Sequence, residues 1–286
     1  MDEIIKAISE DKFVKVSVIT ARDLSERARE IHNSTPVITA AMGRMLSISS
    51  IIGSDMKKAD AFLTTRINGG GPAGTILVVT DSEGNPRCFV QNPVVDIPKN
   101  AEGKLDVGGA VGCAGVLTVI RDFREKEPYI GTTELISGEI AEDFAVYFAE
   151  SEQIPTVCAL GVLVDRDGSV IAAGGYVASL LPGAPDGVID ILENNVVNTG
   201  AVTDILKHDG GADLLLESVM NGLFPRVLSR QGVEYRCTCS RERFLSAILS
   251  LSKSELEDMK EKGEPIETSC QFCNAVYNFE LNEIFC

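Results

Sequence analysis

Two close pairs of cysteines constrain this chain more than any other feature of its sequence. Cys237 and Cys239 lie in "CTCS", and thirty residues later Cys270 and Cys273 lie in "CQFC". Four thiolates in tetrahedral array are a standard ligand set for structural zinc, and a close pair lets one short turn direct two sulfurs at one ion. The same four thiols could instead form two disulfides, or could serve as a metal cage and as disulfides at different times.

The redox compartment bears on this choice. The first residues, "MDEIIKAISEDKFVKV", are acidic where a secretory signal is basic, and no long apolar segment follows. The most apolar stretches, such as "VCALGVLV", are far too short to span a bilayer. We therefore expect a cytoplasmic protein with no membrane partner, in a compartment where stable disulfides are rare. This favours Zn²⁺ bound by four cysteines, with an iron–sulfur cluster as the less favoured alternative.

Charge and spacing argue against three other classes of protein. The formal net charge is −16, and residues 232–286 hold six Lys and Arg against ten Asp and Glu, which disfavours a zinc ribbon that binds nucleic acid. "CQFC" has the spacing of a thiol oxidoreductase, but it does not stand at a strand-to-helix step. The glycine-rich stretches "NGGGPAG" and "GKLDVGGAVG" lack the phosphate-loop pattern and read as tight turns.

Residues 1–186 are predicted to form an α+β domain of mostly antiparallel β-sheet with packed helices. "KFVKVSVIT" is typical of a strand, and "DSEGNP" and "DRDG" each separate two strand-like runs, as in hairpins. About eight such strands are expected before residue 180. "TPVITAAMGRMLSISSIIG" predicts a buried helix with Thr35 as its cap, Pro36 at its first position and Gly53 at its end.

The remaining chain divides into a helical linker and a small cysteine domain. Residues 187–231 are predicted to be helical, cut into short pieces by Gly200 and by the pair Gly210-Gly211. Helices this short must borrow stability from whatever they pack on. Residues 232–286 are predicted to form a zinc domain with two helices, one capped by Ser240 and the other by Ser252 or Ser254. A metal that merely holds this small domain together remains an alternative to a switch.

The cysteine pairs and five other motifs together resemble one known family. "CTCSRERF" and "CQFCNAVYNF" are similar to the C-terminal motif of the heat shock protein 33 family, the redox-regulated 33-kDa chaperonins of bacteria. The resemblance extends over essentially the whole chain. It also includes, in the family's order, "TPVITAAMGRML", "GGGPAGTILVV", "NPVVDIP", "GKLDVGGAVG" and "SGEIAEDFAVYFAESEQIPT".

This resemblance implies a cytoplasmic holdase chaperone that needs no ATP and has no catalytic residue, so that it is not an enzyme. It implies that Cys237, Cys239, Cys270 and Cys273 bind one Zn²⁺ in a reduced, inactive form. It further implies that oxidation forms the disulfides Cys237–Cys239 and Cys270–Cys273, releases zinc and unfolds the zinc domain and the linker. The exposed surface would then bind unfolded client proteins, and the activated form would be a homodimer.

Four cysteines lie outside the motif. Cys88 and Cys158 occur in strand-like segments and are expected to be buried and inert, whereas Cys286 is expected to be exposed. The sequence does not predict the exposure of Cys113. His32 and His208 are expected to be ordinary surface or helix residues, because neither occurs near the cysteine pairs.

Overall fold

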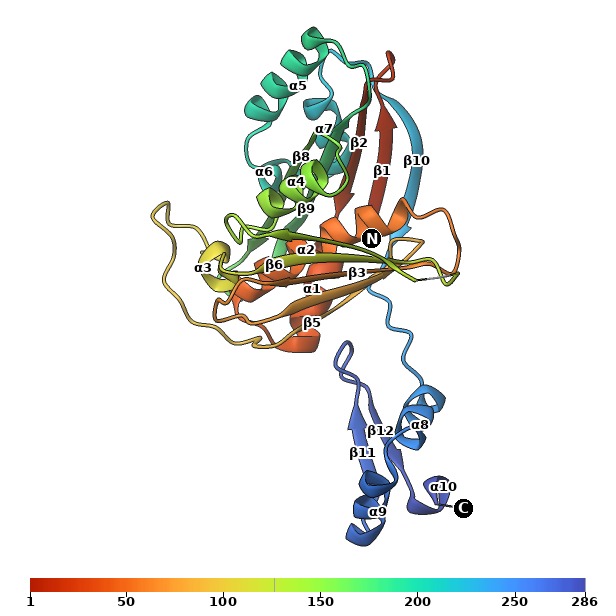
Figure 1. Cartoon of the computed structure of the whole chain (residues 1–286). Helices are drawn as coiled ribbons and strands as arrows, with labels where there is room; N and C mark the ends of the chain where they lie inside the picture. Colours follow the sequence, from red (N-terminus) through yellow and green to blue (C-terminus); the bar gives the residue numbers. More distant parts are fainter. Residues whose placement is uncertain (126, 286) are drawn as a thin grey trace. The chain divides into compact units, whose positions relative to one another are not determined.

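A computed structural model describes residues 1–125 and 127–285 of the chain (Figure 1). The chain divides into two compact units, Met1–Tyr235 and Arg236–Cys286. Within the described residues, the first unit contains two five-stranded sheets and the second a two-stranded one, and all strand pairs are antiparallel. The predicted α+β class is therefore confirmed. The division at residues 186 and 231 remains a prediction.

The first sheet of the larger unit, which we call sheet A, has the strand order β10-β1-β2-β9-β8. Its strands are β10 (Arg226–Val233), β1 (Asp2–Ile8), β2 (Val14–Thr20), β9 (Val170–Leu180) and β8 (Thr156–Val164). The predicted hairpin around "DRDG" is confirmed as the β8–β9 connection, where the Asp165 amide donates to Ser169 O at 2.8 Å. Gly168 adopts a φ of +90° in this turn, a conformation that favours glycine.

The second sheet, sheet B, has the order β5-β4-β3-β6-β7. Its strands are β5 (Pro86–Val90), β4 (Ile76–Asp81), β3 (Phe62–Asn68), β6 (Val116–Asp122) and β7 (Tyr129–Glu134). The short helix α3 (Val107–Val111) precedes β6, and α4 (Ala141–Glu150) follows β7. The hairpin expected around "DSEGNP" is confirmed as β4–β5, and β6 likewise pairs with β7 in antiparallel register.

Helix α2 (Pro36–Ser54), together with α1 (Arg22–His32), fills the main core between the two sheets. Among the described helices α2 alone is long and apolar enough to span a membrane, yet 89% of its most apolar 18-residue stretch is buried inside the protein. Thr35 precedes it as predicted, but its hydroxyl forms no cap hydrogen bond and binds both the amide and the carbonyl of Val95 instead. Gly53 does not end the helix. A Cβ there would lie 2.6 Å from Thr80 Cγ2, so this glycine permits close packing on β4.

Two strands of sheet A were not expected from the sequence. β1 precedes the first predicted strand, and β10 begins inside the segment predicted to be helical, so the helical prediction is wrong for residues 226–231. The two strands pair with each other, with Asp2 opposite Val233. Because this pairing joins segments more than two hundred residues apart in the sequence, neither segment carries a local signal for it.

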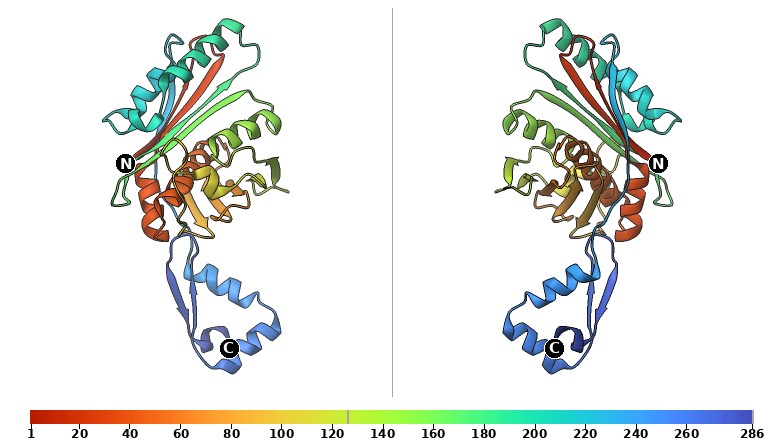
Figure 2. Two further views of the ribbon diagram at one scale, coloured as in Figure 1. Left: turned by 90° about the vertical axis from the view of Figure 1, so that its left-hand side faces the viewer. Right: turned by 90° about the vertical axis from the view of Figure 1, so that its right-hand side faces the viewer.

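Three helices cover the other face of sheet A. They are α5 (Asp186–Thr199), α6 (Val202–Leu206) and α7 (Gly211–Val219) (Figure 2). Neighbouring residues of one strand contribute to different cores: Ile4 faces α2, whereas Ile5 faces these helices. Gly200 and Gly210 adopt left-handed φ values of +65° and +72° and separate the helices, as the sequence predicts.

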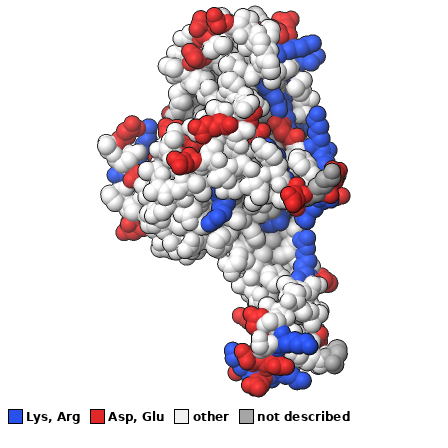
Figure 3. All heavy atoms as spheres, in the orientation of Figure 1, with Lys and Arg blue, Asp and Glu red and all other residues white. Residues whose placement is uncertain are grey.

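The smaller unit holds α8 (Arg241–Leu249), α9 (Lys253–Lys262), β11 (Ile266–Ser269), β12 (Val276–Phe279) and α10 (Leu281–Ile284). The Ser240 hydroxyl caps α8 and the Ser252 hydroxyl caps α9, as predicted. On the face drawn in Figure 3, acidic and basic side chains lie together over the end of the unit that carries α9. The buried apolar core consists of Ile248, Phe279 and Ile284, with other side chains packed around them.

Candidate metal centre

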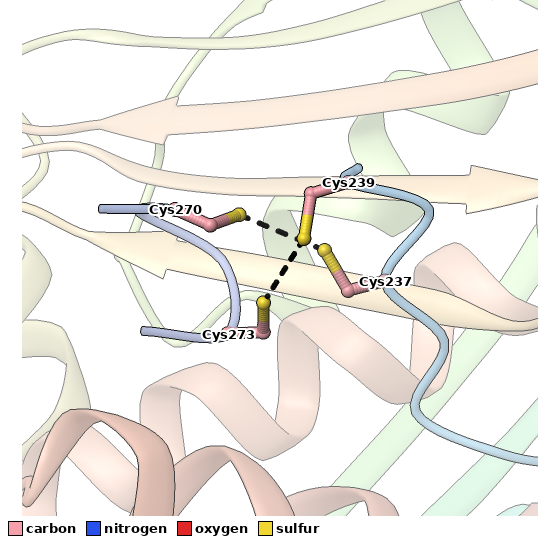
Figure 4. A group of neighbouring side chains, drawn as sticks. All are labelled: Cys237, Cys239, Cys270 and Cys273. Carbon is pink, nitrogen blue, oxygen red and sulfur yellow. Dashed lines mark hydrogen bonds between the residues drawn. The ribbon is translucent and has the colours of Figure 1, made fainter. Parts of the chain in front are cut away.

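The structure brings all four motif cysteines together. Cys237 and Cys239 precede α8, Cys270 directly follows β11, and Cys273 lies in the turn before β12. The four sulfur atoms all lie within 4.8 Å of one another (Figure 4). Sulfurs of the first pair lie close to sulfurs of the second: Cys237 Sγ lies 3.7 Å from Cys270 Sγ, and Cys239 Sγ lies 3.4 Å from Cys273 Sγ.

Backbone hydrogen bonds shape the turn that carries Cys270 and Cys273. The amides of Cys273 and Asn274 both donate to Cys270 O, at 3.3 and 2.8 Å, and the Cys270 amide donates to Ala275 O at 2.9 Å. Asn274 takes a left-handed φ of +57°, which asparagine tolerates better than most residues. The tight turn at the end of the β11–β12 hairpin therefore directs two sulfurs to one point. Cys270 does not stand at a helix N-terminus, as the nucleophile of a thioredoxin-like oxidoreductase would.

Helix α8 braces the other pair. The Arg243 guanidinium donates to Thr238 O at 2.7 Å and to Thr238 Oγ1 at 3.0 Å, and Thr238 stands between the two cysteines. Arg241, on the same helix, has a different role: its guanidinium pairs with Glu283 at 2.7 Å and lies 4.6 Å from the centre of the Phe279 ring. Arg243 thus fixes the backbone of the cysteine pair, and Arg241 closes the unit on α10.

Tyr277 is a member of the site that sequence reasoning missed. Its hydroxyl lies 3.1 Å from Cys239 Sγ, and its ring packs 5.0 Å from the ring of Phe244. Burial opposes ionisation of Cys239, but hydrogen bonds from Tyr277 and the neighbouring thiols lower its pKa overall. The same hydrogen bond to Cys239 raises the pKa of Tyr277 to about 12. Its position, four residues after Cys273 on a strand, is the one signal that could have pointed to it.

Two neighbouring thiols have the opposite tendency. Burial raises the pKa of Cys237 and of Cys273, so of these three cysteines Cys239 is the one whose surroundings most favour the thiolate. A bound cation would favour the thiolate at every position, because a metal ligand must be deprotonated.

The donor set and its spacing fit a metal ion. A tetrahedron of sulfurs about 2.3 Å from zinc has edges of about 3.8 Å, close to the separations of 3.7 and 3.4 Å between the sulfurs of the two pairs. All four cysteines are free thiols in this structure. Within the described residues this is the one group of Cys, His, Asp and Glu side chains close enough to share an ion. Four thiolates select zinc or an iron–sulfur centre over hard cations.

The remaining cysteines lie elsewhere. Cys88 is fully buried in β5 as predicted, and burial raises its pKa to about 12. Cys158 in β8 is half-buried as a residue, while its thiol is enclosed, and burial raises its pKa. Cys113 is exposed, and the expectation for Cys286 lies outside the described residues. His32 is the last residue of α1 and is half-buried, and its Nε2 lies 3.0 Å from Cys88 O.

Comparisons with known proteins agree over almost the whole chain. The family model described as Hsp33 protein matches residues 2–280. A 33 kDa chaperonin of Agathobacter rectalis is 42% identical over 283 residues, which cover 99% of this chain and 98% of the relative. A 33 kDa chaperonin of Clostridioides difficile is likewise 42% identical over 283 residues, covering 99% and 97%.

A solved structure has the same fold. The crystal structure of the 33 kDa chaperonin (heat shock protein 33 homolog) from Thermotoga maritima matches with a TM-score of 0.90 and 35% sequence identity. The match covers 99% of this chain and 96% of that one. With the cysteine cluster and both β-sheets in place, the family match from end to end and these relatives show that the chain belongs to the Hsp33 family of chaperones.

Proposed function

We propose that this chaperone is a redox-gated holdase that needs no ATP. The observation that carries the proposal is a cluster of four thiols in a unit whose own core is very small. The chain that leads into this unit carries three short helices, and these cover an apolar sheet face. The thiol cluster is the sensor in this proposal, and the covered face is the binding surface.

In the reduced form, Cys237, Cys239, Cys270 and Cys273 would hold one Zn²⁺. Bound zinc supplies a fourfold cross-link, with an apparent binding free energy of about 10–16 kcal/mol in zinc-finger peptides. Three buried apolar side chains give the smaller unit little other stability. The fold of this unit would therefore depend on its four sulfur ligands, and the reduced form would be the inactive one.

Oxidation would remove those ligands. In each close pair, one thiolate attacks a peroxide oxygen, breaks the O–O bond and becomes a sulfenic acid; the second thiolate then displaces the sulfenic oxygen. As each disulfide forms, its two thiolates give up two electrons, which with two protons reduce one hydrogen peroxide to two molecules of water. The proposed products are Cys237–Cys239 and Cys270–Cys273. In an extended segment the Cα atoms of residues i and i+2 lie about 6.5 Å apart, near the limit for a disulfide, so the first bond would be strained and readily reduced.

The client surface would be the face of sheet A beneath α5, α6 and α7. These helices have 14, 5 and 9 residues and are too short to be stable alone. Sheet A contributes seven buried side chains to the contact with them: Ile5, Ala7, Val14, Val16, Val18, Tyr176 and Ala178. Loss of the helices would expose a contiguous apolar surface, which is what an unfolded protein binds. Such a surface needs no catalytic residue and no nucleotide.

The same exposure would give the activated form a tendency to pair with a second copy, and we propose a homodimer as the active state. A resting form that depends on reduced thiols also suits the cytoplasm. The partners in this proposal are therefore unfolded or oxidatively damaged proteins and a second copy of the chain.

One experiment measures both halves of the switch together. The zinc-loaded, reduced protein is treated with hydrogen peroxide at mild heat, while zinc release and suppression of aggregation of an unfolding client are followed in the same sample. We expect both to rise together and to reverse with a dithiol reductant. Zinc loss without client protection would show that the metal only holds the unit together.

Disulfide mapping of the oxidised sample tests the pairing. Cys113→Ser serves as the matched control, because Cys113 is exposed and outside the cluster. We expect Cys237–Cys239 and Cys270–Cys273 in both proteins. A product that joins Cys237 to Cys270 and Cys239 to Cys273, whose sulfurs lie 3.7 and 3.4 Å apart, would refute the proposed pairing.

A further inference from the structure

The residues just before the cysteine cluster are hydrogen-bonded to sheet B, although β10 itself belongs to sheet A. We call residues 231–235 the neck. Gln231 and Val233 are part of β10 in sheet A, but the neck also contacts the β4–β5 hairpin of sheet B. The Gln231 side-chain amide donates to Glu83 O at 2.8 Å, and the Glu234 amide donates to Asn85 Oδ1 at 3.0 Å.

Tyr235 makes the third and most enclosed of these contacts. Its hydroxyl accepts a hydrogen bond from the Cys88 amide at 3.1 Å and donates one to Cys88 O at 3.2 Å. Cys88 lies in β5, which forms one edge of sheet B and pairs with β4 among the described strands. The backbone groups of Cys88 that point away from β4 would otherwise lack a strand partner. The Tyr235 phenol satisfies them as the backbone of a neighbouring strand would, and its ring packs against the main core.

The receiving side of these contacts is already ordered. Asn85 is 3% exposed, and both its backbone amide and its side-chain amide donate to Asp81 Oδ1, at 2.9 and 3.3 Å. The Asn85 side-chain oxygen Oδ1 is thus held in place to accept from the Glu234 amide. On the far side of Cys88, His32 Nε2 lies 3.0 Å from the same carbonyl oxygen that Tyr235 binds. The neck therefore docks on a preformed surface, so the β4–β5 hairpin loses little conformational entropy when the neck binds.

The position of the neck in the chain gives these contacts a role. Tyr235 is the last residue of the larger unit, and Cys237 follows two residues later. Unfolding that begins at the cysteines can reach α7 along the chain only through the neck and β10. Local unfolding spreads in cooperative segments and stops where the next segment has independent stability. The neck supplies that stability through sheet B, which does not depend on the thiols.

From these contacts we infer that Tyr235 positions a latch, formed by the neck on the β4–β5 hairpin, that holds residues 187–231 folded after the cysteine unit has lost its structure. This inference deepens the proposed function and rests on it. The latch sets the threshold of the switch: withdrawing the metal from the reduced protein leaves the apolar face of sheet A covered, and the face is uncovered when the neck also releases, as it does under oxidation at mild heat. Removing the Tyr235 hydroxyl leaves the Cys88 amide without its hydrogen-bond partner and the Cys88 carbonyl oxygen with His32 alone, which favours release on the order of tenfold.

The test uses the full-length, reduced protein, so that no disulfide forms. Zinc is withdrawn with a chelator, and amide hydrogen exchange is followed in residues 187–231, in the cysteine unit and in β3. In the parent protein we expect the cysteine unit to lose protection while residues 187–231 keep theirs. In Tyr235→Phe we expect exchange in residues 187–231 to be on the order of tenfold faster after chelation, with β3 unchanged.

Two further variants keep the test specific. Tyr129→Phe makes the same chemical change at a tyrosine of β7 that is 48% exposed, and it should match the parent. Gln231→Ala removes the outermost neck contact and should give a smaller change than Tyr235→Phe. Equal exchange in Tyr235→Phe and Tyr129→Phe would overturn the latch. Equal loss of protection in β3 and in residues 187–231 would also overturn it, because the tyrosine would then support the whole unit.

The outcome separates the latch from the proposed function. If oxidation activates client binding but Tyr235→Phe leaves exchange unchanged, the latch fails and the switch stands. If Tyr235→Phe speeds exchange of residues 187–231 but their release brings no client protection, the latch stands and the proposed function fails. Zinc affinity should be the same in the parent and in Tyr235→Phe, because Tyr235 is not one of the cysteine ligands; a change in that affinity would contradict a role confined to the neck.

Discussion

Two adjacent leucines on α7 offer a sharp test of how the apolar face of sheet A is kept covered. Leu215 is fully buried against sheet A, whereas Leu214 is 46% exposed. Leu215→Ala and Leu214→Ala make the same chemical change one residue apart on the same helix. Alanine is a good helix former, so neither change should weaken α7 by itself.

The expected magnitudes follow from burial. Truncating a fully buried leucine removes its transfer free energy and leaves a cavity, which together cost about 2–5 kcal/mol. A loss of about 3 kcal/mol would shift the equilibrium between covered and uncovered sheet A about 150-fold towards the uncovered state. An exposed leucine changes stability by about 0.5 kcal/mol or less. Leu215→Ala should therefore bind clients while reduced and zinc-loaded, and Leu214→Ala should not.

Two assays read this out without an oxidant. Limited trypsin digestion reports release of the helices, because Lys207 lies directly after α6. Suppression of light scattering by an aggregating client reports exposure of the binding face. Faster cleavage after Lys207 with no gain in client protection would refute the assignment of this face to clients. Equal behaviour of the two variants would refute the reasoning that contact with sheet A, and not helix propensity, holds the face covered.

Two other predictions concern the cysteine cluster and the N-terminal strand. Cys237→Ser should lower zinc affinity by more than about 100-fold and loosen the smaller unit under reducing conditions, whereas Cys113→Ser should do neither. A zinc-binding titration by calorimetry measures this affinity. Unchanged affinity in Cys237→Ser would remove Cys237 from the ligand set. Burial raises the pKa of Asp2 to about 6, although the Leu24 amide donates to its carboxylate at 2.8 Å. Because the folded form holds this proton more tightly than the unfolded chain does, the stability linked to Asp2 is present below about pH 4 and is lost as pH rises through about 6. Asp2→Asn should thus flatten this part of the pH profile in urea unfolding, and an unchanged profile would contradict a buried, proton-binding Asp2.

Local sequence patterns were sufficient where the structure depends on neighbours along the chain. The caps at Ser240 and Ser252 and the hairpins of both sheets follow from residues within a few positions of each other. The spacing of the cysteines predicted one cluster because two short turns can each aim two sulfurs at one point. Resemblance to a family added the redox chemistry and the client-binding role, which spacing alone left open.

The sequence did not predict the pairing of β1 with β10, because that pairing depends on a register between distant segments. It did not separate Leu214 from Leu215, since a run of leucines leaves the buried side of a short helix undefined. Thr35 was expected to cap α2, but a loop sixty residues away takes its hydroxyl. In each case a contact between residues far apart in the chain decided the outcome.

By itself, then, the sequence determined the cysteine cluster, the helix caps at Ser240 and Ser252 and the antiparallel α+β class, because these rest on short-range geometry. Only the tertiary structure decided which face of sheet A lies beneath α5, α6 and α7, that Tyr277 contacts Cys239, and that Tyr235 docks on the edge of β5 at Cys88. The physical reason is that each of these contacts joins residues far apart in the chain, whose approach depends on the packing of the elements between them and on no local pattern.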